Sequence, residues 1–247
     1  MRRAAFALFL ILLALAQVFH PTATLIHGET EVVVEKTSPD TVGLAWIEEQ
    51  EGGVLFIFYD PPPHRVKVRF GEDARAYAAL ALVDQPDEGG GTVALGAGEA
   101  RYLEGEDRVK YALREEAGAV AIEKGRFRAE GRRLDYDNDQ GLARILGPVR
   151  FRREGKRSLS GQAGALLYRV EAGELWLLNG VKLVQEKRIT EAERALIDEE
   201  SGLAFLEGDP VRSEAPDERI AGRRLVYELE SGALWVLEAI QGAFEER

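Results

Sequence analysis

The chain has 247 residues, of which 45% are hydrophobic and 30% charged, so it is long enough to bury a substantial core. Its formal net charge of −11 argues against nucleic acid as a partner, because binding a phosphate backbone requires a surplus of Lys and Arg. The absence of cysteine excludes disulfide bonds, thiolate metal sites and cysteine nucleophiles, and three histidines leave little for zinc chemistry.

The first nineteen residues have the pattern of an export signal. Arg2 and Arg3 precede an apolar run from residue 4 to residue 16, and Gln17 interrupts it before Val18 and Phe19. One interpretation is a signal peptide that is cleaved after the small residues at 14–16. The second is a retained hydrophobic helix, residues 4–19, that anchors the protein in the inner membrane, and a buried core helix is a lesser alternative. The first two interpretations predict that the body of the protein lies outside the cytoplasm, in the periplasm.

The region from residue 25 to residue 84 predicts irregularly spaced strands. Residues 31–35, 54–59 and 66–70 are rich in β-branched and aromatic side chains, and three prolines at 61–63 separate the last two. Residues 74–83 fit either a short helix or an alanine-rich strand. Residues 85–91, with three consecutive glycines, predict a flexible loop.

The second half of the chain contains an internal repeat of about thirty residues. Gly141, Gly173, Gly202 and Gly232 each follow a polar stretch and precede an apolar alternation. Weaker copies surround Gly118 and Gly91. Each unit predicts two strands around a turn in which glycine adopts a positive φ. A short stretch at residues 190–195 has helical character but is too short to change the class. We therefore expect an export segment at 1–19 and one continuous β body at 25–247, with the clearest repeats at 99–244.

Within each unit the apolar residues alternate with period two, which is typical of half-buried strands. Leu175 and Leu177 illustrate the predicted inner face, whereas Trp176, Phe205 and Trp235 fall on the opposite parity. These aromatic residues indicate either exposed strand positions or a second packed layer.

Motifs that would indicate catalysis are absent from the sequence. It has no Gly-x-Ser-x-Gly elbow, no phosphate-binding loop ending in Lys-Ser/Thr and no His-Glu-x-x-His helix. The alternation of Asp135, Asp137 and Asp139 is similar to a calcium loop, but the glycine and the closing glutamate are misplaced, which favours a solvated turn. We predict that the protein is not an enzyme and binds no metal or cofactor.

The repeated unit resembles the OstA-like domain of the lipopolysaccharide-transport proteins LptA and LptC. Residues 131–136 (Gly-Arg-Arg-Leu-Asp-Tyr) and 222–227 (Gly-Arg-Arg-Leu-Val-Tyr), the latter followed by 232–236, carry this resemblance. Residues 179–181 match the family's Gly-Asn-Val step in part, and residues 147–149 depart from it. The resemblance covers residues 99 to 244.

This resemblance implies an all-β fold, a V-shaped antiparallel β-jelly roll with an apolar groove open along one side. It also implies a periplasmic protein that binds the acyl chains of lipopolysaccharide or a related glycolipid and bridges the inner and outer membranes. Its implied partners are other jelly-roll components of lipid transport and outer-membrane biogenesis, joined by pairing of edge strands, and further copies of itself in a head-to-tail oligomer. Cleavage of the segment favours an LptA-like bridge, and a retained anchor favours an LptC-like dock.

The predicted lipid-binding interior consists of apolar residues on the inner parity of the repeated strands. Each of them fits a groove lining or a plain core position. They are Leu134, Tyr136, Ile145, Leu166, Tyr168, Leu175, Leu177, Val181, Leu206, Leu225, Tyr227, Leu234 and Val236. A basic rim for lipid phosphates, or alternatively a solvated face, is predicted at Arg150, Arg152, Arg153, Lys156 and Arg157.

Two rival functions remain from the sequence. The protein is either a lipid carrier of the kind described above or a structural or adhesive β-repeat protein of the envelope with a closed core and no lipid. An exported enzyme is a third interpretation, since Asp and Glu are abundant but no catalytic pair is apparent.

Overall fold

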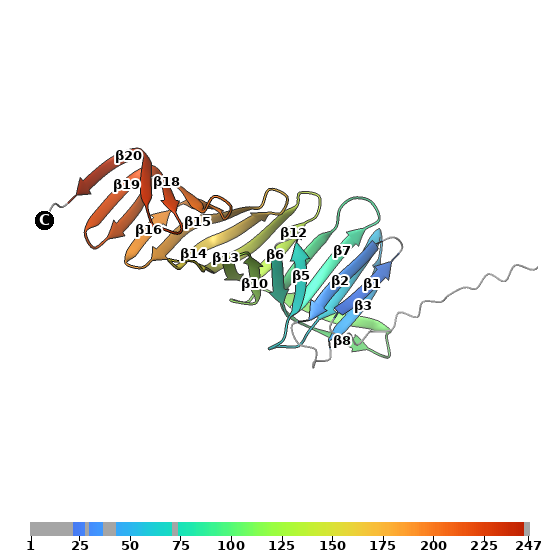
Figure 1. The fold of residues 1–247 in the computed structure, drawn as a ribbon. Helices are drawn as coiled ribbons and strands as arrows, with labels where there is room; N and C mark the ends of the chain where they lie inside the picture. The colour runs from blue at the N-terminus through green and yellow to red at the C-terminus, as the bar shows by residue number, and fades with distance from the viewer. Residues whose placement is uncertain (1–21, 28–29, 37–42, 71–73, 245–247) are drawn as a thin grey trace, which may run out of the picture.

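The computed structural model describes residues 22–27, 30–36, 43–70 and 74–244, and these residues form twenty strands and no helix. Every pairing between the described strands is antiparallel, which confirms the prediction of an all-β antiparallel fold. The strands stack into an elongated body that runs from β1–β3 at one end to β20 at the other (Figure 1). The predicted N-terminal helix at residues 4–19 lies outside the described residues.

The pairings define two sheets that share their longest strands. The strands specific to the first sheet are β1 (Thr22–His27), β2 (Thr30–Lys36), β5 (Val66–Phe70), β6 (Ala74–Ala78), β10 (Val120–Lys124), β11 (Phe127–Gly131) and β16 (Arg188–Ala192). Those specific to the second sheet are β3 (Leu44–Gln50), β4 (Gly53–Tyr59), β7 (Leu80–Pro86), β12 (Arg133–Asp137) and β17 (Arg194–Asp198). The long strands are β8 (Thr92–Leu103), β13 (Leu142–Arg153), β14 (Leu159–Arg169), β15 (Glu174–Gln185), β18 (Leu203–Ala215), β19 (Glu218–Glu228) and β20 (Leu234–Phe244).

Six of the long strands bend and thereby pass from one sheet to the other. The N-terminal half of β13 pairs with β12 in the second sheet, and its C-terminal half pairs with β11 in the first. The register against β14 shifts between Leu146 and Val149, at the cis Gly147–Pro148 peptide. A Cβ on Gly147 would lie 1.8 Å from the carbonyl oxygen of Gly164 on β14, so only glycine permits this close approach of the two backbones.

The interior lies between the facing sides of the two sheets and is filled by the inner-parity residues of the strands. One continuous apolar cluster extends from Val34 on β2 through Phe56 on β4 to Tyr227 on β19. Outer-parity residues such as Arg144 on β13 are exposed, as the alternation of a half-buried strand requires. The body therefore has an apolar interior along its length, and polar side chains occupy many of its outer-parity positions.

A second, smaller core covers the outer face of the second sheet near the N-terminal end. The C-terminal half of β8 and β9 (Arg108–Arg114) form a hairpin, and its Val109 packs with Trp46, Leu55 and Ile57 of the sheet. The rings of Trp46 and Tyr102 lie 5.1 Å apart. This hairpin explains why β4 is buried on both faces.

Several local predictions can be compared with the described strands. Residues 74–83 belong to β6 and β7, so the strand interpretation is correct and the helical one is wrong. The prediction of helical character at 190–195 is wrong, because these residues belong to β16 and β17 and pair with β15 and β18. Gly141, Gly173 and Gly202 have φ values of 58°, 65° and 72° in the turns between paired strands, as predicted for these turns.

Candidate functional site

The structure places the residues of the predicted interior on the facing sides of the two sheets. Ten of them are buried in the continuous cluster: Leu134, Ile145, Leu166, Tyr168, Leu175, Leu177, Val181, Leu206, Leu225 and Tyr227. Tyr136 and Leu234 are partly buried and pack against it. Val236 is 37% exposed although its register partner Leu225 is buried, because β20 pairs with β19 alone among the described strands.

We call the side of the molecule where hairpin turns of the two sheets face one another the mouth. The turns of the first sheet lie at residues 124–127, 153–159 and 185–188, and those of the second sheet at 169–174, 198–203 and 228–234. Side chains of the first set contact residues of the second at several points along the body. The mouth is therefore bridged by contacts between turns that are far apart in the sequence.

A central contact across the mouth is made by Arg153, at the end of β13. Its side chain is fully buried, and its Nε donates to Glu199 Oε1 at 2.8 Å while its Nη2 donates to Glu230 Oε1 at 3.0 Å. The carboxylate of Glu230 also accepts the backbone N–H of Lys156 at 3.1 Å and pairs with Arg126 at 2.6 Å. Arg153, Glu199 and Glu230 form what we call the mouth latch, which joins three turns across the two sheets.

Further contacts bridge the mouth on both sides of the latch. Lys124 Nζ donates to the carbonyl oxygen of Gly173 at 2.6 Å and lies 5.3 Å from the centre of the Tyr168 ring. Gln185 donates to the carbonyl oxygen of Leu229 at 3.0 Å and accepts the hydroxyl hydrogen of Tyr227. The buried Tyr227 thus meets a polar group of the mouth through its hydroxyl, and the buried Tyr168 meets one through the face of its ring.

Nearer the N-terminal end the mouth contact is aromatic. Phe70, at the end of β5 in the first sheet, lies 4.7 Å from Tyr136 of β12 in the second sheet, measured between ring centroids. Burial raises the pKa of Tyr136, and the nearby carboxylates of Glu171 and Asp137 raise it further, so its hydroxyl is neutral at physiological pH. This part of the mouth is therefore held by an uncharged contact.

The hydrogen bonds that Glu230 accepts favour its charged form. The backbone N–H of Lys156 and the hydrogen bond from Arg153 hold the pKa of Glu230 below its ordinary value of 4.5. Glu230 is therefore ionised at neutral pH, and its charge offsets that of the buried guanidinium.

The predicted basic rim does not exist as one surface. Alternation along β13 places Arg150 and Arg152 on the exposed outer face and directs Arg153 into the mouth, where it is buried against carboxylates. Arg157 pairs with Glu186 at 3.4 Å in the turn region. The sequence pattern did not reveal the latch, since the partners of Arg153 lie 46 and 77 residues away.

The acidic alternation near residue 137 forms a turn. Asp137 Oδ1 accepts the backbone N–H of Gln140 at 2.9 Å, and Asp135 pairs with Arg133 at 2.7 Å. Among the residues that the structure describes, no group of three or more His, Asp or Glu side chains is arranged to hold a metal ion. Within the same residues, no helix has the length and apolar character needed to cross a bilayer.

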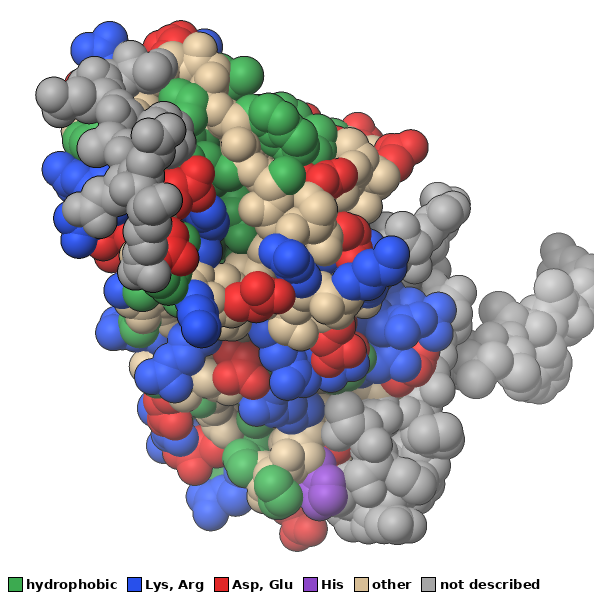
Figure 2. Space-filling model, turned by 60° about the vertical axis from the view of Figure 1, so that its left-hand side comes forward, with side chains coloured by type: hydrophobic (Ala, Val, Ile, Leu, Met, Phe, Trp, Pro, Cys, Tyr) green, Lys and Arg blue, Asp and Glu red, His purple; other side chains and the backbone are tan. Residues whose placement is uncertain are grey.

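The C-terminal end of the body exposes apolar side chains and an open strand. Trp235 and Leu237 of β20 are 48% and 61% exposed, and among the described strands β20 pairs only with β19. Figure 2, which turns this end of the molecule forward, shows hydrophobic side chains open to solvent among acidic and basic ones.

Comparison with known proteins gives a distant similarity of fold. No family model and no curated protein matches the chain. The structure is similar to that of LptH from Pseudomonas aeruginosa, described as the LptA-homologous periplasmic component of the conserved lipopolysaccharide transport device. The match has a TM-score of 0.36 and 13% sequence identity, and it covers 68% of this chain and 84% of LptH.

Proposed function

We propose that the protein is an exported, non-catalytic carrier that holds the acyl chains of a lipid, such as lipopolysaccharide or a related glycolipid, between its two sheets. The observation that carries this proposal is the continuous apolar interior, which extends from β2 to β19. An acyl chain is long and apolar and needs a trough of matching length, and stacked strands with inner Leu, Val and Ile supply one.

The composition of the mouth fits an amphipathic cargo. Acyl chains inserted between the sheets would leave the polar head of the lipid at the turns, beside charged groups such as Lys124 and Arg126. Tyr168 and Tyr227, with apolar bodies and polar outer ends, lie at the boundary between the two environments. Lipid entry in this proposal requires the contacts across the mouth to separate, so the described structure corresponds to the closed state.

The ends of the body fit a bridge made of several units. An edge strand presents unpaired backbone N–H and C=O groups, and β20 adds exposed apolar side chains that a following strand would cover. We propose that β20 pairs with an edge strand of another jelly-roll component or of a second copy, which would extend the interior across the junction. In this arrangement residues 1–19 export or anchor the protein, residues 25–247 form the carrier, and the periplasm is its location.

Photocrosslinking with an acyl probe tests the proposal directly. A fatty acid that carries a diazirine would be incubated with the full chain, irradiated, and its adducts located by peptide mass spectrometry. The prediction is labelling of Leu166 and Leu177, which face the interior, with little labelling of their neighbours Leu167 and Leu178 on the outer face. Equal labelling of inner and outer positions, or no saturable labelling, would contradict the carrier function.

One observation favours a second candidate function, a structural β-repeat protein of the envelope. The inner residues are almost fully buried, and the mouth latch joins turns of the two sheets. A body of this kind would assemble through its ends while its interior remains dry. The same experiment separates the two functions, since the structural protein would give no inner-face adducts.

A further inference from the structure

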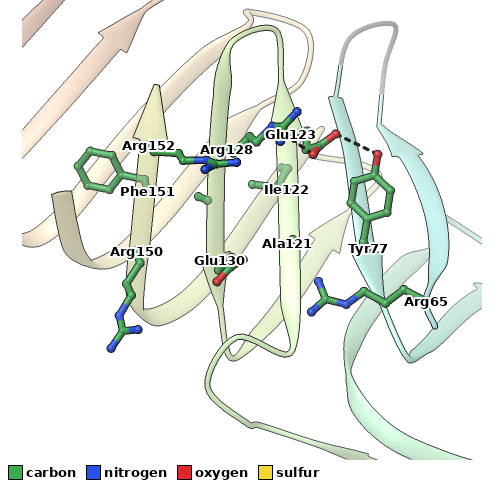
Figure 3. Close-up of a pocket in the computed structure, with 11 residues that line it drawn as sticks. Arg65, Tyr77, Ala121, Ile122, Glu123, Arg128, Glu130, Arg150, Phe151 and Arg152 are labelled. Carbon is green, nitrogen blue, oxygen red and sulfur yellow. Dashed lines mark hydrogen bonds and ion pairs between the residues drawn. The ribbon is translucent and has the colours of Figure 1, made fainter. Parts of the chain in front are cut away.

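The outer face of the first sheet contains a hollow that is separate from the interior. It has a volume of about 520 Å³ and lies over β6, β10, β11 and β13, with Arg65 from the segment before β5 at one side (Figure 3). We call this hollow the outer pocket. Its charged lining consists of Arg65, Arg128, Arg150, Arg152, Glu123 and Glu130.

The hollow arises because a small residue occupies the centre of a row of long ones. Ala121 on β10 lies directly opposite Tyr77 on β6 and Glu130 on β11. The next outer position of β10 is Glu123, which lies opposite Arg128. Long side chains therefore surround a floor that Ala121 leaves low, and the strands themselves form its base at inward-facing residues such as Ile122 and Phe151.

The charge of the pocket is opposite to that of the protein as a whole. Four arginines and two glutamates line it, whereas the chain carries a formal net charge of −11. Arg128 and Arg152 are directly opposite each other on neighbouring strands, and each has one carboxylate partner, Glu123 at 3.3 Å and Glu154 at 3.9 Å respectively. The pocket thus concentrates positive potential on an acidic molecule.

The contacts of the lining side chains leave arginines directed toward the hollow. Glu123 accepts hydrogen bonds from Tyr77 Oη at 3.0 Å and is paired with Arg128 Nε at 3.3 Å. Arg65 Nη2 donates to the carbonyl oxygen of Gly118 at 3.2 Å, which holds this side chain at the rim. The side chains of Arg128 and Arg152 are about half exposed, so an anion in solution can reach them.

We propose that the outer pocket binds a phosphate-bearing ligand through Arg128 and Arg152, with Arg65 and Arg150 at its rim. The planar guanidinium group matches the oxygens of a phosphate and donates two parallel hydrogen bonds to it. A phosphate placed between two opposed arginines removes their mutual repulsion. The low apolar floor accommodates the carbon atoms that carry the phosphate.

Two sources can supply a ligand of this chemistry: a soluble phosphate compound, or the phosphorylated headgroup of a lipid whose acyl chains lie elsewhere. The proposal concerns the outer face and does not depend on acyl binding between the sheets. Probes without acyl chains therefore test it independently of the proposed carrier function.

The test is a binding titration of the full chain at low ionic strength. The probes are inorganic phosphate, glucose 1-phosphate, vesicles that contain a phosphorylated glycolipid, and vesicles of phosphatidylcholine alone. Binding of the first two supports a soluble ligand, and binding of the glycolipid vesicles alone supports a lipid headgroup. We expect the double variant R128Q/R152Q to bind the probe that the unmodified protein binds with an affinity lower by about tenfold or more, because both charge-assisted contacts are lost.

A matched control is the double variant R212Q/R219Q, which removes two exposed arginines from β18 and β19 of the same sheet, away from the pocket. It should bind as the unmodified protein does, and circular dichroism should show both variants folded. The proposal would be overturned if none of inorganic phosphate, glucose 1-phosphate and the glycolipid vesicles bound, or if the two double variants weakened binding to the same extent. It would also be overturned if vesicles of phosphatidylcholine, whose phosphate is a zwitterionic diester, bound as well as the glycolipid vesicles.

Discussion

Replacing Arg153 by methionine tests whether the mouth latch holds the two sheets together. The guanidinium is fully buried and is the common partner of Glu199 and Glu230. Removal of one partner from a buried ion pair costs about 3–5 kcal/mol. Because both carboxylates are partly exposed and can be rehydrated, and because methionine keeps part of the packing, we expect the lower end, about 3 kcal/mol.

Urea unfolding followed by tryptophan fluorescence measures this loss, and the matched control is R152M. Arg152 is the preceding residue on the same strand, but it is 61% exposed and lies 3.9 Å from Glu154, so its replacement should change stability by less than about 0.5 kcal/mol. R153M should also take up the acyl photoprobe faster than the unmodified protein. If R153M were as stable as R152M and its uptake unchanged, the latch would have no role in closing the mouth.

Three further predictions follow from the same geometry. The pKa of Glu230 is lowered in the folded protein, so the stability that its pairing contributes is complete above the ordinary pKa of 4.5. That stability is lost as the pH falls through the lowered pKa. The melting temperature should therefore fall less steeply between pH 7 and pH 3 for E230Q than for the unmodified protein. V236K, on the exposed edge strand β20, should reduce self-association measured by light scattering. The control I189K, at a similarly exposed position on β16, should not reduce it. Equal effects of the two variants would argue against pairing through β20. G202A should lower the free energy of unfolding by about 1–2 kcal/mol because φ at Gly202 is 72°, although a Cβ there meets nothing within 4 Å. G173A should lower it further, because its Cβ would also press on Lys124 across the mouth. An unchanged urea midpoint for G202A would show that this turn can relax.

The strands of the second half were predictable because each carries its own signal. The period-two alternation of Leu175 and Leu177 against Trp176 identifies the inner face correctly, since burial on one side of a sheet acts on every second residue. The turn glycines were predictable for a similar reason, because a positive φ is costly for other residues.

The prediction failed where tertiary contacts override local preference. Residues 190–195 contain Glu, Ala and Arg, which favour a helix, yet pairing with β15 on one side and β18 on the other holds them as strands. Residues 74–83 were ambiguous because alanine is small and apolar in either structure. Their burial between neighbouring strands determines the outcome.

The candidate site was also predictable from the sequence only in part. The apolar lining follows from alternation, but the mouth latch depends on a strand bend that brings Arg153 to turns far along the chain. The hairpin of β8 and β9 over Trp46 was equally hidden, since nothing in its own sequence indicates which face it covers. Sequence periodicity therefore predicted which residues are inside and not which turns meet.

Native mass spectrometry of protein purified from the cell envelope tests whether the interior holds lipid. We expect acyl lipid to be released at a fixed stoichiometry, and the intact mass of the protein locates its N-terminus. Protein that is free of lipid and also takes up none when it is added would refute the carrier function and favour the structural repeat.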